Sequence, residues 1–164
     1  MSKLNNIKIF IFLIVVFLVL NSCAKLSPSG FWKNFNSQLI ENKSSNQGPF
    51  GGTRIVKWNN IDGKIKSKDF LKFANENGWN LIDSIEIQSK KINEIELKKI
   101  DKYAIEVIEQ EILPELQDEN SKIYIFKTGW IRVKPGNEIE TEQNGFLISN
   151  SNNKSFEVIQ KWGE

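Results

Sequence analysis

The sequence predicts an α+β fold, with a mainly antiparallel sheet of about five strands and two helices on one face. Five segments have the alternating or β-branched composition of strands, and two have the apolar spacing of helices. The last three strands follow one another with only short polar turns between them. Because strands joined in this way pair antiparallel, we expect a C-terminal three-stranded meander.

The elements of the first half follow in order. Residues 53–58 (TRIVKW) form a strand by their β-branched content. A helix is expected over 67–77, because Ser67 can cap its first turn and Asn77-Gly78 supplies a left-handed stop. Residues 79–88 (WNLIDSIEIQ) then alternate as a half-buried strand does.

The alternation of this second strand predicts which of its side chains share the core. The inward residues are Trp79, Leu81, Ile85 and Ile87. We expect them to pack with Phe70 and Phe73 of the helix and with the inward face of a later strand. Truncation of Leu81 to Ala should then cost about 2–5 kcal/mol of stability.

The second half contains a helix and three strands. The helix follows a cap at Asp101 and ends or kinks at Pro114. Its apolar face consists of Ile100, Tyr103, Ala104, Val107, Ile108 and Leu113. The strands are expected at 122–133, 145–149 and 156–162. Gly129 interrupts the first of them, which predicts a β-bulge or a close approach by another backbone.

The N-terminus has the organisation of a secretory signal peptide. Lys3 and Lys8 precede an apolar run at 9–20 (IFIFLIVVFLVL) that contains no charge, Pro or Gly. At about 1.5 Å of rise per residue, this run is well short of the ~20 residues that span a hydrocarbon core. It therefore predicts a secretion signal. The residues that end it, Leu20-Asn21-Ser22-Cys23, resemble the lipobox of bacterial lipoproteins.

This resemblance implies that Cys23 is acylated and becomes the first residue of the mature chain. Leu20 and Ser22 match the aliphatic and small residues that precede the modified cysteine, whereas Asn21 departs from the usual pattern. The alternatives are an ordinary signal peptide with a chance cysteine, or an uncleaved anchor. Against both, Cys23 is the only cysteine and the region lacks an A-x-A cleavage site. The resemblance covers the first 23 residues only.

The chain is thus expected to consist of a signal peptide at 1–22, a lipidated tether at 23–52 and one α+β domain at 53–164. Within the tether, residues 31–40 place apolar side chains on one face of a short helix. This helix either lies on the bilayer or packs on the domain. We favour packing, because membrane-surface helices carry a basic polar face and this one has only Lys33.

Composition excludes several classes of function. Two of the 22 Lys and Arg residues lie in the signal, so 20 basic residues face 20 acidic ones and the mature chain is neutral. A nucleic-acid partner, which requires a clustered basic surface, is therefore not expected. With no histidine, the chain has no imidazole base or ligand. We assign no catalytic or metal-ligating residue and expect no cofactor. The acidic residues between 106 and 119 are typical of a solvated helix face.

Tryptophan is the residue type that stands out, with five in 164 residues. We consider a binding surface formed by Trp130, Trp162 and Trp58, near Thr128-Gly129 and the C-terminus, because indoles anchor partners. The alternative, which we favour, is that these indoles close the edge of the core.

Three classes of function stay open at this point. The favoured one is a non-enzymatic envelope lipoprotein, held on the bilayer through Cys23, that binds a protein partner as an accessory subunit or inhibitor. The second is a glycan or small-ligand module that uses exposed Trp residues. The third is a carboxylate-only enzyme such as a glycosidase, which needs two acids about 5 to 9.5 Å apart. If the host has two membranes, Ala24 in place of Asp favours the outer membrane.

Overall fold

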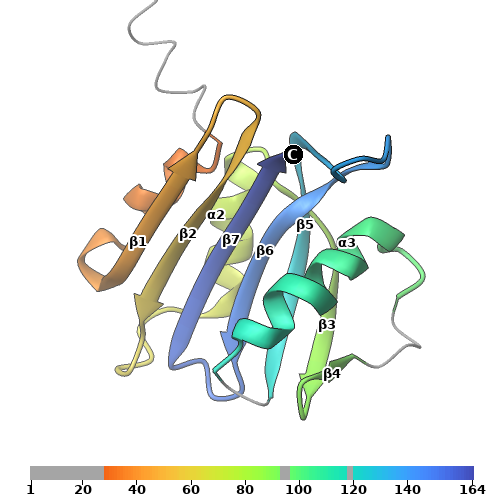
Figure 1. The fold of residues 1–164 in the computed structure, drawn as a ribbon. Helices are drawn as coiled ribbons and strands as arrows, with labels where there is room; N and C mark the ends of the chain where they lie inside the picture. The colour runs from red at the N-terminus through yellow and green to blue at the C-terminus, as the bar shows by residue number, and fades with distance from the viewer. Residues whose placement is uncertain (1–27, 93–96, 118–119) are drawn as a thin grey trace, which may run out of the picture. The chain divides into compact units, whose positions relative to one another are not determined.

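A computed structural model describes residues 28–92, 97–117 and 120–164. Cys23 and the predicted boundary after residue 22 lie outside this part of the chain. The chain divides into two compact units, Met1–Gly30 and Phe31–Glu164. In the second unit, the described residues form a seven-stranded sheet with helices (Figure 1). The strands are β1 (Ile40–Gln47), β2 (Gly51–Asn59), β3 (Asn80–Gln88), β4 (Lys91–Ile92), β5 (Ser121–Val133), β6 (Glu140–Asn150) and β7 (Ser155–Gly163).

The helical segments are short. They are the 3₁₀ turns η1 (Gly30–Asn34) and η2 (Ser37–Leu39), the α-helices α2 (Ser67–Glu76) and α3 (Lys102–Val107), the π-helical η4 (Ile108–Ile112) and the 3₁₀ turn η5 (Leu113–Glu115). The helix expected at 67–77 is confirmed, and Gly78, with φ 86°, terminates it. Its capping residue is Lys66 and not Ser67, because the Lys66 N–H donates to the Asp69 carboxylate at 2.9 Å.

The sheet has the order β1-β2-β7-β6-β5-β3-β4, and neighbouring strands in this order pair antiparallel. An α+β fold with a mainly antiparallel sheet is therefore confirmed. The expected meander is β5-β6-β7, in the middle of the sheet. The expected number of five strands is wrong, because β1 and β4 had not been recognised.

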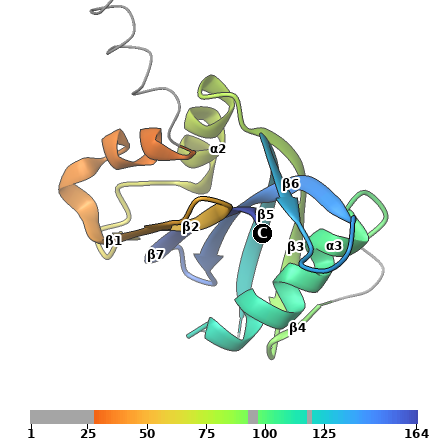
Figure 2. The same ribbon diagram turned by 45° about the horizontal axis from the view of Figure 1, so that its top comes forward.

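The two α-helices pack on opposite faces of the sheet, so the prediction that both cover one face is wrong. Figure 2 shows α2 and α3 on the two sides. The reason is visible along β5, where Ile123 and Ile125 belong to the core under α3 and Phe126 belongs to the core under α2. Because successive side chains of a strand point to opposite faces, an all-apolar stretch of β5 supplies both cores.

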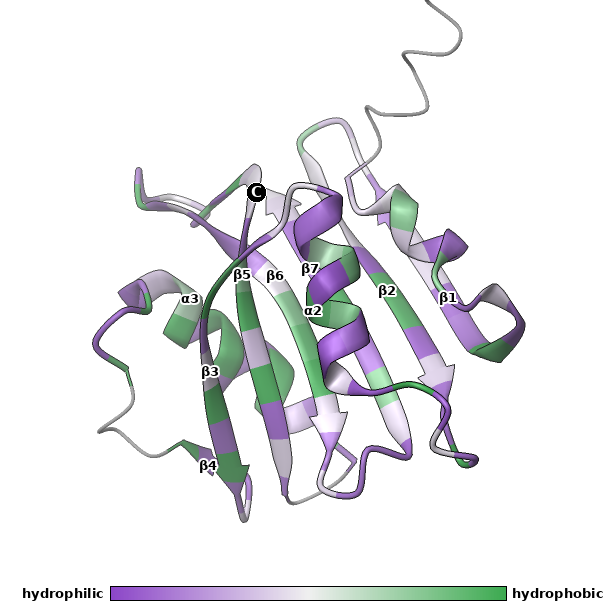
Figure 3. Ribbon diagram, turned by 180° about the vertical axis from the view of Figure 1, so that it is seen from behind, coloured by the Kyte–Doolittle hydropathy of each residue, from purple (hydrophilic) through white to green (hydrophobic). Residues whose placement is uncertain are grey.

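The core under α2 is aromatic. Phe70 and Ala74 of the helix are buried on it, and Figure 3 shows α2 lying over the strands on this side. The ring centroid of Phe70 lies 4.5 Å from that of Phe35 and 4.5 Å from that of Phe156. The other buried members of this core are Trp32, Val56, Trp58, Ile65, Trp79, Phe126, Leu147 and Val158.

The core under α3 is aliphatic. It contains Ile85, Ile87, Ile100, Tyr103, Ala104, Val107, Ile108, Ile112, Leu116, Ile123, Ile125, Phe146, Ile148 and Ile159. All six residues of the predicted helix face pack in it, Leu113 only partly buried. The helical course continues past α3 through η4 and η5, so Pro114 ends it inside a 3₁₀ turn.

A bulge in β3 overturns the prediction that this strand feeds one core. Leu81 pairs with Phe126 and Asp83 pairs with Ile125, which leaves Ile82 as an extra residue. The extra residue exchanges the two faces, so Trp79 packs under α2 while Ile85 packs under α3. Leu81 itself is 47% exposed. The expected cost of 2–5 kcal/mol for its truncation is therefore too large.

The segment assigned to a tether at 23–52 folds with the domain from Phe31 onward. Trp32 and Phe35 are buried in the α2 core, and residues 40–47 form an edge strand of the sheet. The expected single helix over 31–40 is replaced by η1 and η2. Of the two readings of this segment, packing on the domain agrees with the structure.

Candidate functional site

The part of the sheet that α3 leaves uncovered forms a groove of about 390 Å³, named here the α3-face groove. The segment that runs from η4 past η5 forms one wall, and β1 and β2 extend the floor on the other side. The residues that line it are Asn42, Ser44, Thr53, Ile55, Lys57, Glu111, Ile112, Glu115, Leu116, Gln117, Ser121, Ile148, Asn150, Ser155, Glu157, Ile159 and Lys161.

The floor of the groove follows from the alternation of β2 and β7. Odd-numbered residues of both strands face the groove, because their even-numbered neighbours are buried in the α2 core. The register pairs Lys57 with Glu157 and Ile55 with Ile159 directly across the two strands. The floor therefore has an apolar pair, Ile55 and Ile159, next to a pair of charged side chains, Lys57 and Glu157.

Glu111 is the most heavily paired group of the groove. Its carboxylate accepts a bond from Arg132 Nη2 at 2.6 Å and a second from Lys161 Nζ. Burial alone would raise the pKa of Glu111, but the hydrogen bonds and charges of Lys161 and Arg132 outweigh it and hold that pKa below its ordinary value. The helical segment is thereby joined to β5 and β7. Another member of the acidic run, Glu106, is paired with Lys134 at 2.5 Å.

Glu157 has the opposite environment. Burial in the groove floor raises the pKa of its carboxyl group, and the charge of Lys57 on the neighbouring strand opposes that rise only in part. The groove thus holds one carboxylate that is stabilised in its charged form and another whose charge is penalised.

The strand β1 borders the groove and leaves its outer edge open. Among the described residues it pairs only with β2. Its sequence, IENKSSNQ, has one apolar residue and no Pro, and seven of its eight residues are exposed. Unpaired backbone groups along a regular strand are a template for pairing with another chain.

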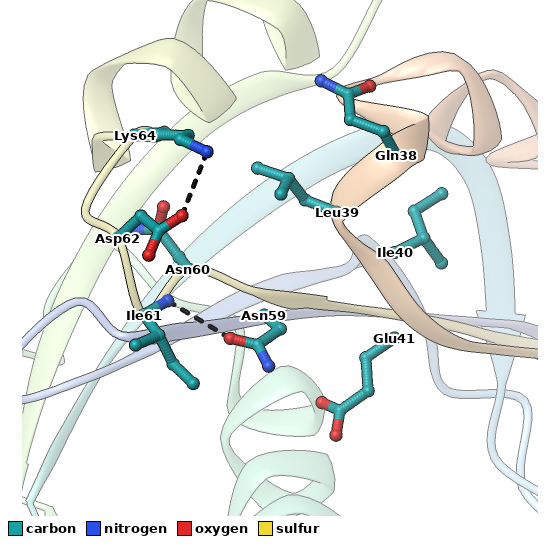
Figure 4. Close-up of a pocket in the computed structure, with 9 residues that line it drawn as sticks. All are labelled: Gln38, Leu39, Ile40, Glu41, Asn59, Asn60, Ile61, Asp62 and Lys64. Carbon is teal, nitrogen blue, oxygen red and sulfur yellow. Dashed lines mark hydrogen bonds and ion pairs between the residues drawn. The ribbon is translucent and has the colours of Figure 1, made fainter.

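A second recess, of about 420 Å³, lies where η2 and the start of β1 meet the loop after β2. Figure 4 shows Lys64 and Asp62 paired on one side of it, on the loop after β2, with Nζ 3.0 Å from the carboxylate. The buried side chain of Asn60 organises the loop, since it accepts from Ile65 N at 2.8 Å and donates to Ile65 O and Asn153 O. Because these bonds hold the loop in place, we assign the recess a structural role.

A third recess, of about 540 Å³, lies on the α2 side of β3, β5 and β6. Its charged groups Lys122 and Glu86 are 3.5 Å apart and both are well exposed. Because such pairs contribute little, this recess has weaker features for recognition than the α3-face groove.

The three tryptophans predicted to share a surface do not form one. Trp58 is fully buried in the α2 core, where its Nε1 donates to Phe35 O at 2.8 Å. Trp162 is 6% exposed, and only Trp130 is accessible, at 38%. The first two therefore close the core, as the favoured alternative held.

The bulge expected at Gly129 is present. Gly129 has φ 74°, and the pairing of β5 with β6 is interrupted between Lys127 and Arg132. A buried polar network fixes it: Thr128 Oγ1 donates to Asn144 Oδ1 at 2.6 Å, and Asn144 Nδ2 donates to Trp130 O at 2.6 Å. No atom lies within 4 Å of a Cβ built on Gly129, so the positive φ, and not a close approach, requires glycine.

The sequence did not point to the residues of the groove. Glu111 is predicted among the acids of a solvated helix face, and no sequence motif assigns a role to Glu157 or Lys161. The one available signal was the alternation of residues 155–161, which places these charges on a common face with Ile159.

The described residues include no helix with the length and hydropathy of a membrane span. In the same part of the chain, no three His, Cys, Asp or Glu side chains gather in a way that could hold a metal ion.

No family model, no curated protein and no solved structure matches this chain.

Proposed function

We propose that this chain is a lipid-anchored protein of the bacterial envelope that binds an extended segment of a partner protein and catalyses no reaction. The anchor rests on the lipobox residues Leu20, Ser22 and Cys23. If the host has two membranes, Ala24 favours the outer one. The binding role rests on the open edge of β1 beside the α3-face groove.

The open edge is the observation that carries the proposal. The hairpin bond from Gly48 N to Gly51 O, at 2.8 Å, fixes which residues of β1 bond to β2. Since bonded and non-bonded pairs alternate along an antiparallel ladder, the backbone groups of Lys43, Ser45 and Gln47 point away from β2. They offer three consecutive pairing positions to an incoming strand.

The groove supplies the specificity that backbone pairing lacks. Asn42 and Ser44 of β1 line the groove, so alternate side chains of a strand added beside them would lie along the same face. The side chains of the added strand would contact Ile55 and Ile159 and the charges of Lys57 and Glu157. A partner segment with alternating apolar and charged residues fits this surface.

Site-specific photo-crosslinking in the native envelope tests the binding role. A photoreactive residue in place of Asn42 should give a discrete adduct, whereas one in place of Lys72, on the exposed side of α2, should not. Ser45→Pro removes an outward N–H and should abolish the adduct; Ser45→Ala keeps that N–H and should retain it. An adduct that survives Ser45→Pro in folded protein would exclude pairing at this edge.

Metabolic labelling tests the anchor. A fatty-acid analogue should label the wild type, and Cys23→Ser should lose the label and either leave the membrane or accumulate as the unprocessed precursor. Equal labelling of the two proteins would exclude acylation at Cys23.

A carboxylate-only hydrolase is the second candidate, favoured by one observation. Glu111 and Glu157 line the same groove, and their pKa values are displaced in opposite directions, as acid and base roles require. Glu157→Gln should then abolish turnover of a glycan substrate without unfolding the domain. A Trp-based glycan module has less support, because Trp58 and Trp162 are buried.

A further inference from the structure

We infer that one end of the sheet domain lies against the membrane surface that holds the acylated Cys23. This end, named here the Gly163 end, is the one at which Gly51 of β2 pairs with Gly163 of β7. The inference rests on the proposed lipid anchor and adds an orientation to it.

The exposed apolar side chains of the domain are gathered at the Gly163 end. Six large apolar side chains are exposed among the described residues, namely Phe50, Ile61, Leu81, Trp130, Ile131 and Ile139. Ile61 alone lies at the opposite end, just after the pairing of Asn59 with Ser155.

The register places the other five at the Gly163 end. Phe50 is in the β1–β2 turn, and its carbonyl accepts from Glu164 N at 3.1 Å. Trp130 and Ile131 precede Arg132, which is bridged to Gly163. Ile139 bonds to Lys134 across the tip of the β5–β6 hairpin. Figure 1 shows both hairpin tips and the C-terminus at this end of the sheet.

Leu81 belongs to the same group, because its neighbour Asn80 pairs with Lys127 of β5 just before the Gly129 bulge. Single exposed apolar residues are common on soluble domains, but a concentration at one end marks an interaction surface. Tryptophan is moreover the residue type that concentrates at membrane interfaces.

The chain enters the domain at the Gly163 end as well. The second unit begins at Phe31, whose ring meets that of Trp79 edge-on at 5.6 Å between centroids. Trp79 immediately precedes Asn80, at the start of β3. Phe31 follows Cys23 by only eight positions. A chain of that length extends to at most about 29 Å, so an anchored Cys23 holds Phe31 within that distance of the bilayer.

Charge does not compete with the apolar contact. Four cations of this region are paired with carboxylates: Arg132 and Lys161 with Glu111, Lys134 with Glu106, and Lys127 with Glu142. No unpaired basic cluster is therefore left among them to require anionic lipid. Contact with a neutral bilayer should suffice, and added salt should change it little.

Fluorescence quenching by brominated lipid tests the orientation directly. Of the five tryptophans, Trp130 alone is substantially exposed. Full-length acylated protein is inserted into phosphatidylcholine vesicles whose acyl chains carry bromine. We expect quenching of the wild type and at least a twofold smaller quench in Trp130→Phe, whose four other indoles stay shielded in the domain.

A matched pair of variants controls for general surface hydrophobicity. Phe50→Ser combined with Ile139→Ser should reduce the quench of Trp130, and Ile61→Ser at the opposite end should leave it unchanged. A quench that is equal in all variants, or that depends on the ratio of protein to lipid as contact between copies would, overturns the inference.

The outcomes for anchor and orientation are separable. Protein that floats with the vesicles but shows no quench overturns the orientation and leaves acylation standing. Wild-type protein that floats no better than Cys23→Ser overturns the lipid anchor, and the orientation with it.

Discussion

At the scale of single residues, Glu111 and Glu157 show how one groove gives the same chemical group two opposite energetic roles. Their neighbours differ. Lys161 and Arg132 donate hydrogen bonds to the Glu111 carboxylate, whereas Lys57 acts on Glu157 only through its charge. Burial acts on both carboxyls, so the number of hydrogen bonds decides the direction in which each pKa moves.

The two carboxylates should therefore respond oppositely to removal of their charge. The pKa of Glu111 is lowered on folding, so its stabilisation is complete above the unfolded-state pKa and is lost as pH falls through the folded-state pKa. Glu111→Gln should lower the free energy of unfolding by about 1–2 kcal/mol at neutral pH, with the loss shrinking in acid.

For Glu157 the folded-state pKa is raised, so the cost of its charge is absent below the unfolded-state pKa and complete above the folded-state pKa. Glu157→Gln should accordingly equal or exceed the wild type in stability at about pH 7 and lose that advantage below about pH 4. Urea unfolding of both variants across this range measures the two trends. Parallel trends would contradict the assigned environments.

At the scale of elements, the bulge at Ile82 makes Leu81 and Ile85 a matched pair. Without the bulge both would point into one core; with it, Leu81 is 47% exposed and Ile85 is fully buried. Ile85→Ala should cost about 2–5 kcal/mol, and Leu81→Ala less than about 1 kcal/mol. Thermal and urea unfolding compare them. Equal losses of stability in the two variants would contradict the bulge and favour the regular strand register expected from the sequence.

The same elements show what sequence patterns can and cannot predict. The helix at 67–76 was predictable because its apolar stripe and its glycine stop are local signals, although the capping residue is Lys66 and not Ser67. The bulge was not, since an extra residue in a strand depends on the partner strand. The edge strand β1 was missed because IENKSSNQ carries no apolar alternation, which an exposed edge does not need. The groove depends on that strand, so the candidate site could not be predicted either.

At the scale of the whole molecule, the two helices explain both the stability of the sheet and its open surface. Each α-helix covers only part of one face, and α3 sits over β3, β5 and β6. A strand such as β5 must then be apolar on both faces, and a continuous hydrophobic run does not indicate the side on which a helix lies. The uncovered part of the α3 face is the groove.

The same architecture makes the segment before β1 a structural part of the domain. Trp32 is fully buried and Phe35 is 9% exposed, both in the aromatic core with Phe70. Loss of a buried aromatic side chain costs about 3–5 kcal/mol, and the total stability of a domain is only about 5–15 kcal/mol. A chain that begins at Gly30 should unfold cooperatively. A chain that begins at Ile40 should not fold even at about 25 °C, close to the temperatures at which domains are most stable.

Near-ultraviolet circular dichroism during a thermal scan distinguishes the two chains, because the packed indoles of the α2 core give its aromatic signal. Trp32→Ala in the full-length chain controls for the effect of truncation and should lower the midpoint by removing the same contacts. If the chain that begins at Ile40 melted cooperatively at the temperature of the longer chain, residues 30–39 would be a tether, as the sequence suggested. The α2 core would then have to be held by the aromatic contacts that remain, Trp58 with Phe70, Phe70 with Phe156 and Trp79 with Phe126.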